Sequence, residues 1–175
     1  MQDVLSMLAR ALGQAGLSHA LIGGHAVNAR LEPRFTADID LVIAVAAAAL
    51  SRFRQTLAAE GFVVDVEDGA QEPSGPDFVR FVSADGLVRV EIQVAKTRFQ
   101  REVIQRSRAD DIGLCVATPE DLIVMKLIAN RPKDQIDLIG LLGLAALDWP
   151  YIERWADEWG VTDVLRRAAE RVPRS

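Results

Sequence analysis

Apolar residues recur along this chain in two patterns, one with the period of a helix and one with the alternation of a strand. Four apolar residues between positions 4 and 12 fall on one helical face, which predicts a helix over residues 2–15. Every second residue from position 88 to position 94 is apolar, which predicts a strand over residues 87–95. The same patterns predict helices over residues 25–31, 46–60, 98–108, 118–130, 132–143, 149–159 and 162–172, and strands over residues 19–22, 39–45, 62–66, 78–83 and 112–116.

Strands dominate the first part of this order and helices the last part. We therefore predict an α/β (α+β) fold, with a mixed β-sheet flanked by helices over residues 1–117. A helical part over residues 118–175 is expected to pack on this core. Two prolines and two glycines between positions 68 and 76 predict a loop there.

The composition indicates a globular protein. Apolar residues make up 50% of the chain and charged residues 26%, as in ordinary soluble domains. No apolar run is long enough to cross a membrane, and the amino terminus lacks the basic start of a secretion signal. The single cysteine, Cys115, excludes an internal disulfide. We expect a cytoplasmic protein.

The charge distribution limits the kinds of partner. A net charge of −5 argues against a broad surface for nucleic acid. Two basic clusters leave a local contact open, although each alone is most simply a solvated helix face. Their members are Lys96, Arg98, Arg101, Arg106 and Arg108, and then Arg166, Arg167, Arg171 and Arg174.

Three carboxylates are candidates for catalysis and for a metal site. Asp38 and Asp40 lie two residues apart at the start of a predicted strand and therefore point to the same face. Glu91 lies on the polar face of the strand over residues 87–95. If these strands are neighbours, the three carboxylates can bind two Mg²⁺ ions that activate an attacking hydroxyl and stabilise a leaving pyrophosphate. Each acid alone is more simply a polar residue of a strand, and only the order of elements favours chemistry.

A glycine pair and two further residues suit the phosphates of a nucleotide. Gly23 and Gly24 follow a predicted buried strand and let backbone amides approach phosphates closely. Arg34 and Thr36 are placed to help hold a triphosphate. A glycine turn followed by converging carboxylates predicts phosphoryl or nucleotidyl transfer. Asp40 or Glu91 is then a candidate base toward the acceptor hydroxyl.

The motifs resemble the nucleotidyltransferase superfamily of the polymerase-beta and kanamycin-nucleotidyltransferase type, through Gly23-Gly24, Asp38-Ile39-Asp40 and Glu91. Residues 21–27 and 34–40 are similar to the first motif of the bacterial AbiEii-like branch, which includes toxins of toxin–antitoxin pairs. A later motif of that branch, a helical lysine followed by an arginine and K-D-x-x-D, resembles Lys126, Arg131, Lys133-Asp134 and Asp137.

This resemblance implies a Mg²⁺-dependent enzyme that moves a nucleoside monophosphate from an NTP to an acceptor hydroxyl. An RNA or tRNA end is the favoured acceptor, and an antitoxin protein is an implied partner. The resemblance also implies a catalytic, phosphate-contacting role for Lys126 and a nucleotide-binding role for Asp134. From the residues alone, Lys126 is expected to reach water from an apolar helix, and Asp134 and Asp137 to complement a helix dipole.

Other functions remain open. The layout also resembles small aminoglycoside nucleotidyltransferases, whose polycationic acceptors need an acidic pocket. The residues that would supply this pocket are Asp65, Glu67, Asp68 and Glu72. A protein hydroxyl is a further acceptor. A hypothesis from another class is a non-catalytic nucleotide-binding module with the same fold.

Overall fold

The computed structural model describes residues 1–45, 47–69 and 76–173. The chain forms two compact units. The sheet unit contains Met1–His25 and Phe35–Ala117, and the helical unit contains Ala26–Arg34 and Thr118–Ser175. The division into domains 1–117 and 118–175 stays a prediction, because the helical unit also includes the segment Ala26–Arg34.

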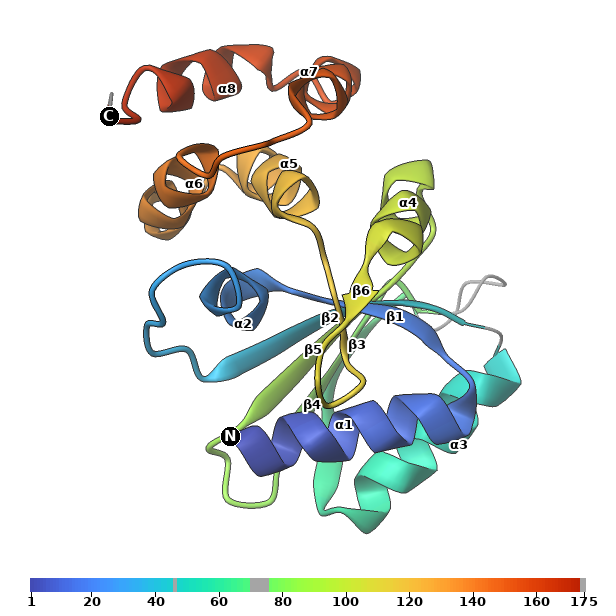
Figure 1. The fold of residues 1–175 in the computed structure, drawn as a ribbon. Helices are drawn as coiled ribbons and strands as arrows, with labels where there is room; N and C mark the ends of the chain where they lie inside the picture. Colours follow the sequence, from blue (N-terminus) through green and yellow to red (C-terminus); the bar gives the residue numbers. More distant parts are fainter. Residues whose placement is uncertain (46, 70–75, 174–175) are drawn as a thin grey trace. The chain divides into compact units, whose positions relative to one another are not determined.

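The sheet unit is built on one mixed sheet, whose seven described strands run in the order β3-β4-β5-β2-β1-β7-β6 (Figure 1). β2 pairs in parallel with β5, and β1 pairs in parallel with β7. The other neighbours are antiparallel. The strands are β1 (Ser18–Ile22), β2 (Asp38–Ala44), β3 (Phe62–Asp68), β4 (Phe78–Ser83), β5 (Arg89–Val94), β6 (Arg108–Ala109) and β7 (Cys115–Val116).

Three longer helices flank this sheet. Figure 1 shows α1 (Gln2–Ala15) and α3 (Ala47–Ala59) on one side and α4 (Arg98–Arg106) on the other. α1 ends at Gly16, whose φ of 66° closes the helix in the left-handed conformation that glycine adopts without strain. α4 begins with a capping box between Thr97 and Gln100. Gly16 and Thr97 are thus residue types that favour the end and the start of a helix, respectively.

The helical unit contains four helices and a 3₁₀ turn in its described part. These are α5 (Pro119–Ala129), η1 (Pro132–Asp134), α6 (Gln135–Leu142), α7 (Trp149–Glu158) and α8 (Thr162–Ala169). α5 packs against α6 and α7, and α8 packs against α6 and α7. The Tyr151 hydroxyl donates to fully buried Asp121 over 2.5 Å, which links α7 to α5. The short helix α2 (Gly23–Asn28) begins in the sheet unit and continues into the helical unit.

The predicted fold class is confirmed, and most predicted elements lie within a few residues of their expected bounds. The expected strand over residues 112–116 is only Cys115–Val116, and the two-residue strand β6 was not predicted. The helix expected over residues 132–143 begins as the 3₁₀ turn η1 and continues as α6. Position 46, loop positions 70–75 and Arg174 lie outside the described residues. No helix among the described residues is long and apolar enough to cross a bilayer.

Candidate active site

The pairing of β2 with β5 brings the predicted acids onto neighbouring strands. Asp40 is the register partner of Glu91, and Asp38 is the partner of Arg89. The residues between them, Ile39 and Val90, are fully buried, so the acids share the opposite, accessible face. Adjacent strands lie about 4.8 Å apart, so the carboxylates of Asp40 and Glu91 arise from neighbouring points of the sheet.

Arginines hold two of these acids in the structure. Arg89 Nε donates to Asp38 Oδ1 over 2.7 Å, and Arg80 donates to Glu91 Oε1 over 2.8 Å. Among the described residues, no group of three His, Cys, Asp or Glu side chains is arranged to hold a metal ion. The metal roles of Asp38, Asp40 and Glu91 therefore stay predictions, and the arginines occupy one carboxylate oxygen each of Asp38 and Glu91.

The glycine pair lies directly against the second acid and the predicted threonine. Gly23 has a φ of 64°, and a Cβ built there would lie 2.0 Å from Asp40 Oδ2. A Cβ on Gly24 would lie 2.7 Å from Thr36 Oγ1. Both positions need glycine because a larger residue would occupy the space of Asp40 or Thr36.

These groups suit a hard divalent cation. All three acids provide oxygen ligands on one face, and Gly23 leaves the carboxylate of Asp40 room beside the turn. Mg²⁺ prefers a few carboxylates together with phosphate and water oxygens. The residue types therefore suit the predicted ion, while the described side chains are not arranged to hold it in this structure.

His25 follows the glycine pair in α2. Its Nε2 atom is buried and has no hydrogen-bond partner among the described residues. Burial and the chain's amino-terminal charge lower the pKa of His25, and the nearby charge of Asp38 only partly opposes this. The ring is therefore neutral near pH 7.

A second charged cluster lies inside the helical unit, and we name it the lysine–arginine network. Its residues are Lys126, Asp134, Asp137, Arg34 and Arg131. Lys126 Nζ donates to Asp134 over 3.0 Å and to Asp137 over 2.9 Å. Each aspartate also binds one arginine through two donors, Asp137 with Arg34 and Asp134 with Arg131. One buried lysine thus joins two bidentate arginine–aspartate pairs.

Burial changes the interpretation of this cluster. The Lys126 side chain is only 8% exposed, so the expectation that it reaches water is wrong. Asp134 and Asp137 bind cations rather than serving only a helix dipole. The positive charge that solvent can reach is on the two arginines, whose side chains are 46% exposed in Arg34 and 57% exposed in Arg131. Sequence reasoning missed this arrangement, although the spacing of Lys126, Arg131 and the two acids carried the signal.

Replacing Lys126 by methionine is expected to destabilise the protein by about 1–3 kcal/mol, because it removes a buried charged donor from two carboxylates that keep only their arginines. The matched control is Lys133→Met in η1, where the side chain is exposed and the cost should stay below about 0.5 kcal/mol. Urea unfolding followed by circular dichroism gives both values. Equal costs for the two variants would contradict a structural role for the buried lysine.

The same network predicts a loss of stability in acid. Burial acts to raise the pKa of Asp134 and Asp137, but hydrogen bonds from the arginines and Lys126 outweigh it and hold each pKa below its usual value. A carboxyl with a lowered pKa in the folded state stabilises the fold above the unfolded pKa of about 3.9. We therefore expect the free energy of unfolding to fall as the pH drops below about 4. Urea titrations at several pH values measure this, and Asp137→Asn should show a shallower fall than the unmodified chain.

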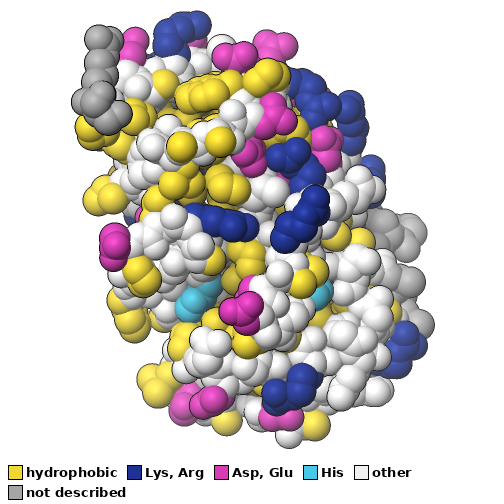
Figure 2. Space-filling model, in the orientation of Figure 1, with side chains coloured by type: hydrophobic (Ala, Val, Ile, Leu, Met, Phe, Trp, Pro, Cys, Tyr) yellow, Lys and Arg dark blue, Asp and Glu magenta, His cyan; other side chains and the backbone are white. Residues whose placement is uncertain are grey.

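The acids considered for a polycationic acceptor are partly neutralised. Glu67 pairs with Arg54, and Asp65 lies 3.6 Å from Arg80. Glu72 lies outside the described residues. On the face drawn in Figure 2, acidic and basic side chains are mixed. An acidic pocket built from Asp65 and Glu67 would therefore need these arginines to move away.

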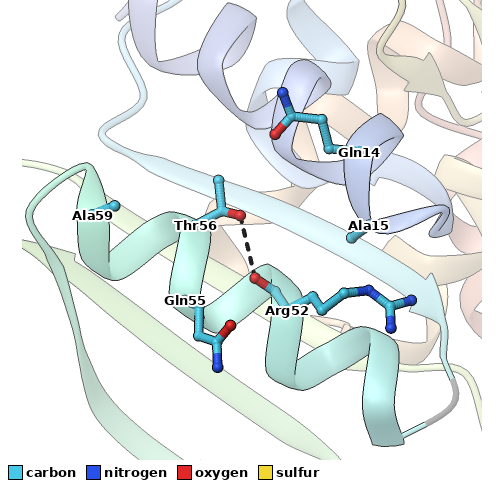
Figure 3. A pocket seen from close by; sticks show the side chains of 6 residues that line it. All are labelled: Gln14, Ala15, Arg52, Gln55, Thr56 and Ala59. Atoms are coloured by element: carbon cyan, nitrogen blue, oxygen red, sulfur yellow. Dashed lines mark hydrogen bonds between the residues drawn. The ribbon is translucent and has the colours of Figure 1, made fainter.

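One hollow in the surface of the sheet unit is lined by residues of helices α1 and α3. Gln14 and Ala15 of α1 line it together with Arg52, Gln55, Thr56 and Ala59 of α3 (Figure 3). The Thr56 hydroxyl donates to the Arg52 carbonyl and is satisfied within its own helix. No predicted site residue lines this hollow, so it does not mark the candidate active site.

Comparison with known protein families identifies the family of this chain. Residues 6–154 match the model of the family described as "Nucleotidyl transferase AbiEii toxin, Type IV TA system". The chain belongs to the AbiEii family. It is therefore a nucleotidyltransferase with an NTP as substrate, and its family is that of toxins with antitoxin partners.

Solved structures of other proteins share the fold of this chain at low sequence identity. An antigenic nucleotidyltransferase-like protein from Paracoccidioides brasiliensis is 19% identical, with a TM-score of 0.59 over 99% of this chain and 93% of that one. JHP933 from Helicobacter pylori is 16% identical, with a TM-score of 0.56 over 99% and 83% of the two chains. ANT(2'')-Ia in complex with adenylyl-2''-tobramycin is 17% identical, with a TM-score of 0.54 over 96% and 95%. A search of curated protein sequences found no significant match.

Proposed function

We propose that this AbiEii-family enzyme transfers a nucleoside monophosphate from an NTP to the terminal hydroxyl of an RNA, with Mg²⁺ as cofactor. The observation that carries the proposal is the register of β2 and β5, in which Asp40 lies beside Glu91 and against Gly23. An acid pair beside a glycine turn suits nucleotidyl transfer, because carboxylates can bind metal and a glycine turn can lie close to phosphates.

Each part of this arrangement has a distinct role in the proposal. Asp38, Asp40 and Glu91 would hold Mg²⁺, which would lower the pKa of the attacking hydroxyl and offset charge on the leaving pyrophosphate. The hydroxyl oxygen bonds to the α-phosphorus while the bond to pyrophosphate breaks. Asp40 or Glu91 accepts the hydroxyl proton. The backbone amides at Gly23 and Gly24 are the proposed phosphate contacts, beside the Asp40 and Thr36 side chains.

The positive charge of the helical unit supports a role in holding the triphosphate. Arg34 precedes Thr36 and Asp38 in the same segment, and its guanidinium is held by Asp137. Lys126 and Asp134 are proposed to act through the lysine–arginine network, because Lys126 is buried against both aspartates. The network carries three positive and two negative charges, and its accessible part consists of the two arginines.

RNA is favoured over an aminoglycoside as the acceptor. Pairing with Arg54 and Arg80 reduces the charge that Glu67 and Asp65 offer to a polycation. ANT(2'')-Ia, the neighbour with a bound adenylylated tobramycin, supports the fold but has only 17% identity. Transfer to an aminoglycoside is therefore the alternative result that the test also measures.

The test incubates the purified chain with Mg²⁺, each labelled NTP in turn, and total tRNA, an aminoglycoside panel or the antitoxin protein. Label that enters RNA supports the proposal and identifies the nucleotide. Label that enters an aminoglycoside or a protein overturns the RNA assignment but keeps the enzyme class. Omitting Mg²⁺ and adding EDTA should abolish transfer, and undiminished transfer in EDTA would overturn the metal role.

A further inference from the structure

The charge of this chain is distributed unevenly along the sequence. Residues 96–108 contain five basic residues and one acid, Glu102, which gives this segment a net charge of +4. The whole chain has a net charge of −5, so the remaining residues together carry −9. The second basic cluster is weaker, because residues 162–174 combine four arginines with Asp163 and Glu170 and have a net charge of +2. A local positive surface on an acidic protein attracts a polyanion to one place rather than to the whole molecule.

Helix α4 carries part of this charge on its outer face. Phe99 and Val103, one turn apart, are at most 3% exposed and form the buried face of the helix. Arg101 lies on the opposite face at 3.6 residues per turn and is exposed. Arg108, also exposed, begins β6 shortly after the helix ends. All four residues belong to the sheet unit.

The charges of Arg101 and Arg108 are not balanced by an acid. Arg101 Nη1 donates to the Lys96 carbonyl over 3.0 Å, and Arg108 Nη1 donates to two backbone carbonyls at the end of α4 over 2.9 and 3.0 Å. In the part of the chain that the structure describes, neither guanidinium is paired with a carboxylate. By contrast, Arg80 and Arg89 each hold one of the candidate acids. A guanidinium held by neutral carbonyls keeps its full charge and further N–H donors for phosphate oxygens.

Hydrogen bonds within the sheet unit fix the place of α4 relative to the candidate acids. Before the helix, the Ala95 amide donates to the Ile43 carbonyl over 2.8 Å. After it, Ser107 Oγ donates over 3.3 Å to the carbonyl of His19, the register partner of Ile43. Ile43 is three residues from Asp40 along β2, so both ends of α4 are anchored about 10 Å along the sheet from that acid. This is about the axial length of three nucleotides in a duplex.

We propose that Arg101 and Arg108 form a surface, the α4 surface, that binds the sugar–phosphate backbone of the RNA acceptor a few nucleotides from its reacting end. The inference rests on the proposed function, because RNA is the proposed acceptor. Contacts to phosphates position a nucleic acid but do not read its sequence. The α4 surface therefore holds the acceptor near the acids without selecting its bases.

The test measures the binding of a labelled single-stranded RNA by fluorescence anisotropy over a range of salt concentrations. The double variant Arg101→Gln with Arg108→Gln should bind this RNA about 5- to 30-fold more weakly at low salt. The slope of log K against log[salt] should fall in magnitude by about 1.4, because each phosphate contact on a single strand contributes about 0.7. Arg101→Lys with Arg108→Lys keeps both charges and should retain the slope of the unmodified chain.

The matched control is Arg166→Gln with Arg167→Gln on α8, which removes the same two charges from the weaker cluster. It should leave the affinity for RNA and the salt slope close to those of the unmodified chain. Equal weakening in this control would assign the effect to net charge and overturn the inference. Unchanged RNA affinity in the α4 glutamine variant, or an equal loss in the lysine variant, would also overturn it. So would a glutamine variant that keeps its RNA affinity but loses binding to an acidic protein.

Transfer kinetics separate this inference from the proposed function. The α4 glutamine variant should raise the KM for RNA and leave kcat and the KM for the NTP unchanged. If the chain binds RNA through the α4 surface but transfers no nucleotide to it, the proposed function fails and the surface stands. If label enters RNA and the glutamine variant has an unchanged KM for RNA, the surface fails and the proposed function stands.

Discussion

Replacing Asp40 by asparagine is expected to abolish nucleotidyl transfer and leave the fold intact. Asparagine keeps the shape of the side chain beside Glu91 and Gly23 but removes the negative charge. Loss of a charged group at the reacting centre should lower kcat by about a thousandfold or more. Label transfer measures the loss, and circular dichroism with thermal unfolding tests the fold.

Asp163→Asn is the control for this substitution. Asp163 lies on α8 with a side chain that is 75% exposed and paired only with Arg166 among the interactions resolved for it. Its replacement should leave kcat within about twofold of the unmodified chain, because surface ion pairs contribute little. An Asp40→Asn protein that retains about a tenth of the normal kcat would show that Asp40 is not a catalytic ligand.

Gly23→Ala is expected to damage both stability and activity. A Cβ at this position would lie 2.0 Å from Asp40 Oδ2, on a backbone with a φ of 64°. The left-handed conformation alone costs an alanine about 1–2 kcal/mol, and displacing Asp40 should bring the total to about 3 kcal/mol or more. A shift of Asp40 by about 1 Å should lower kcat about a hundredfold.

Gly16→Ala separates these two effects. Gly16 has nearly the same φ, 66°, but a Cβ there would meet nothing within 4 Å. This variant should lose only the backbone cost of about 1–2 kcal/mol and keep normal turnover. Urea unfolding and label transfer on both variants provide the comparison. Equal losses in the two proteins would mean that the close approach of Gly23 to Asp40 is not important for activity.

Local patterns were sufficient to predict most of the fold. The alternation of buried and accessible residues in β5 and the proline-containing start of α5 are readable without any partner segment. β6 was not predicted, and β7 is shorter than the strand expected over residues 112–116, because two-residue strands are defined by their pairing rather than by a period. The strand β3 also extends to Asp68, where pairing with β4 overrides the polar sequence.

The candidate site was predictable in its residue types but not in its pairings. Asp38, Asp40 and Glu91 follow from spacing, and their relation depends on the register between β2 and β5. The bond between Arg34 and Asp137 joins residues 103 positions apart, so no local rule reveals it. Lys126 and its two aspartates are only 8 and 11 positions apart, so their spacing carried a signal, but the burial of the lysine depends on the packing of α5 against α6.

The helical unit is assembled from two stretches of chain that are far apart in sequence, and this limits how the protein can be divided. A fragment that ends at position 117 would contain Arg34 and Leu31 but lack Asp137 and Gly140, against which they lie. A graft of residues 118–175 onto another protein would lack the same partners. Recombination, in the laboratory or in evolution, would therefore have to exchange Ala26–Arg34 together with the carboxy-terminal helices to transfer this unit whole.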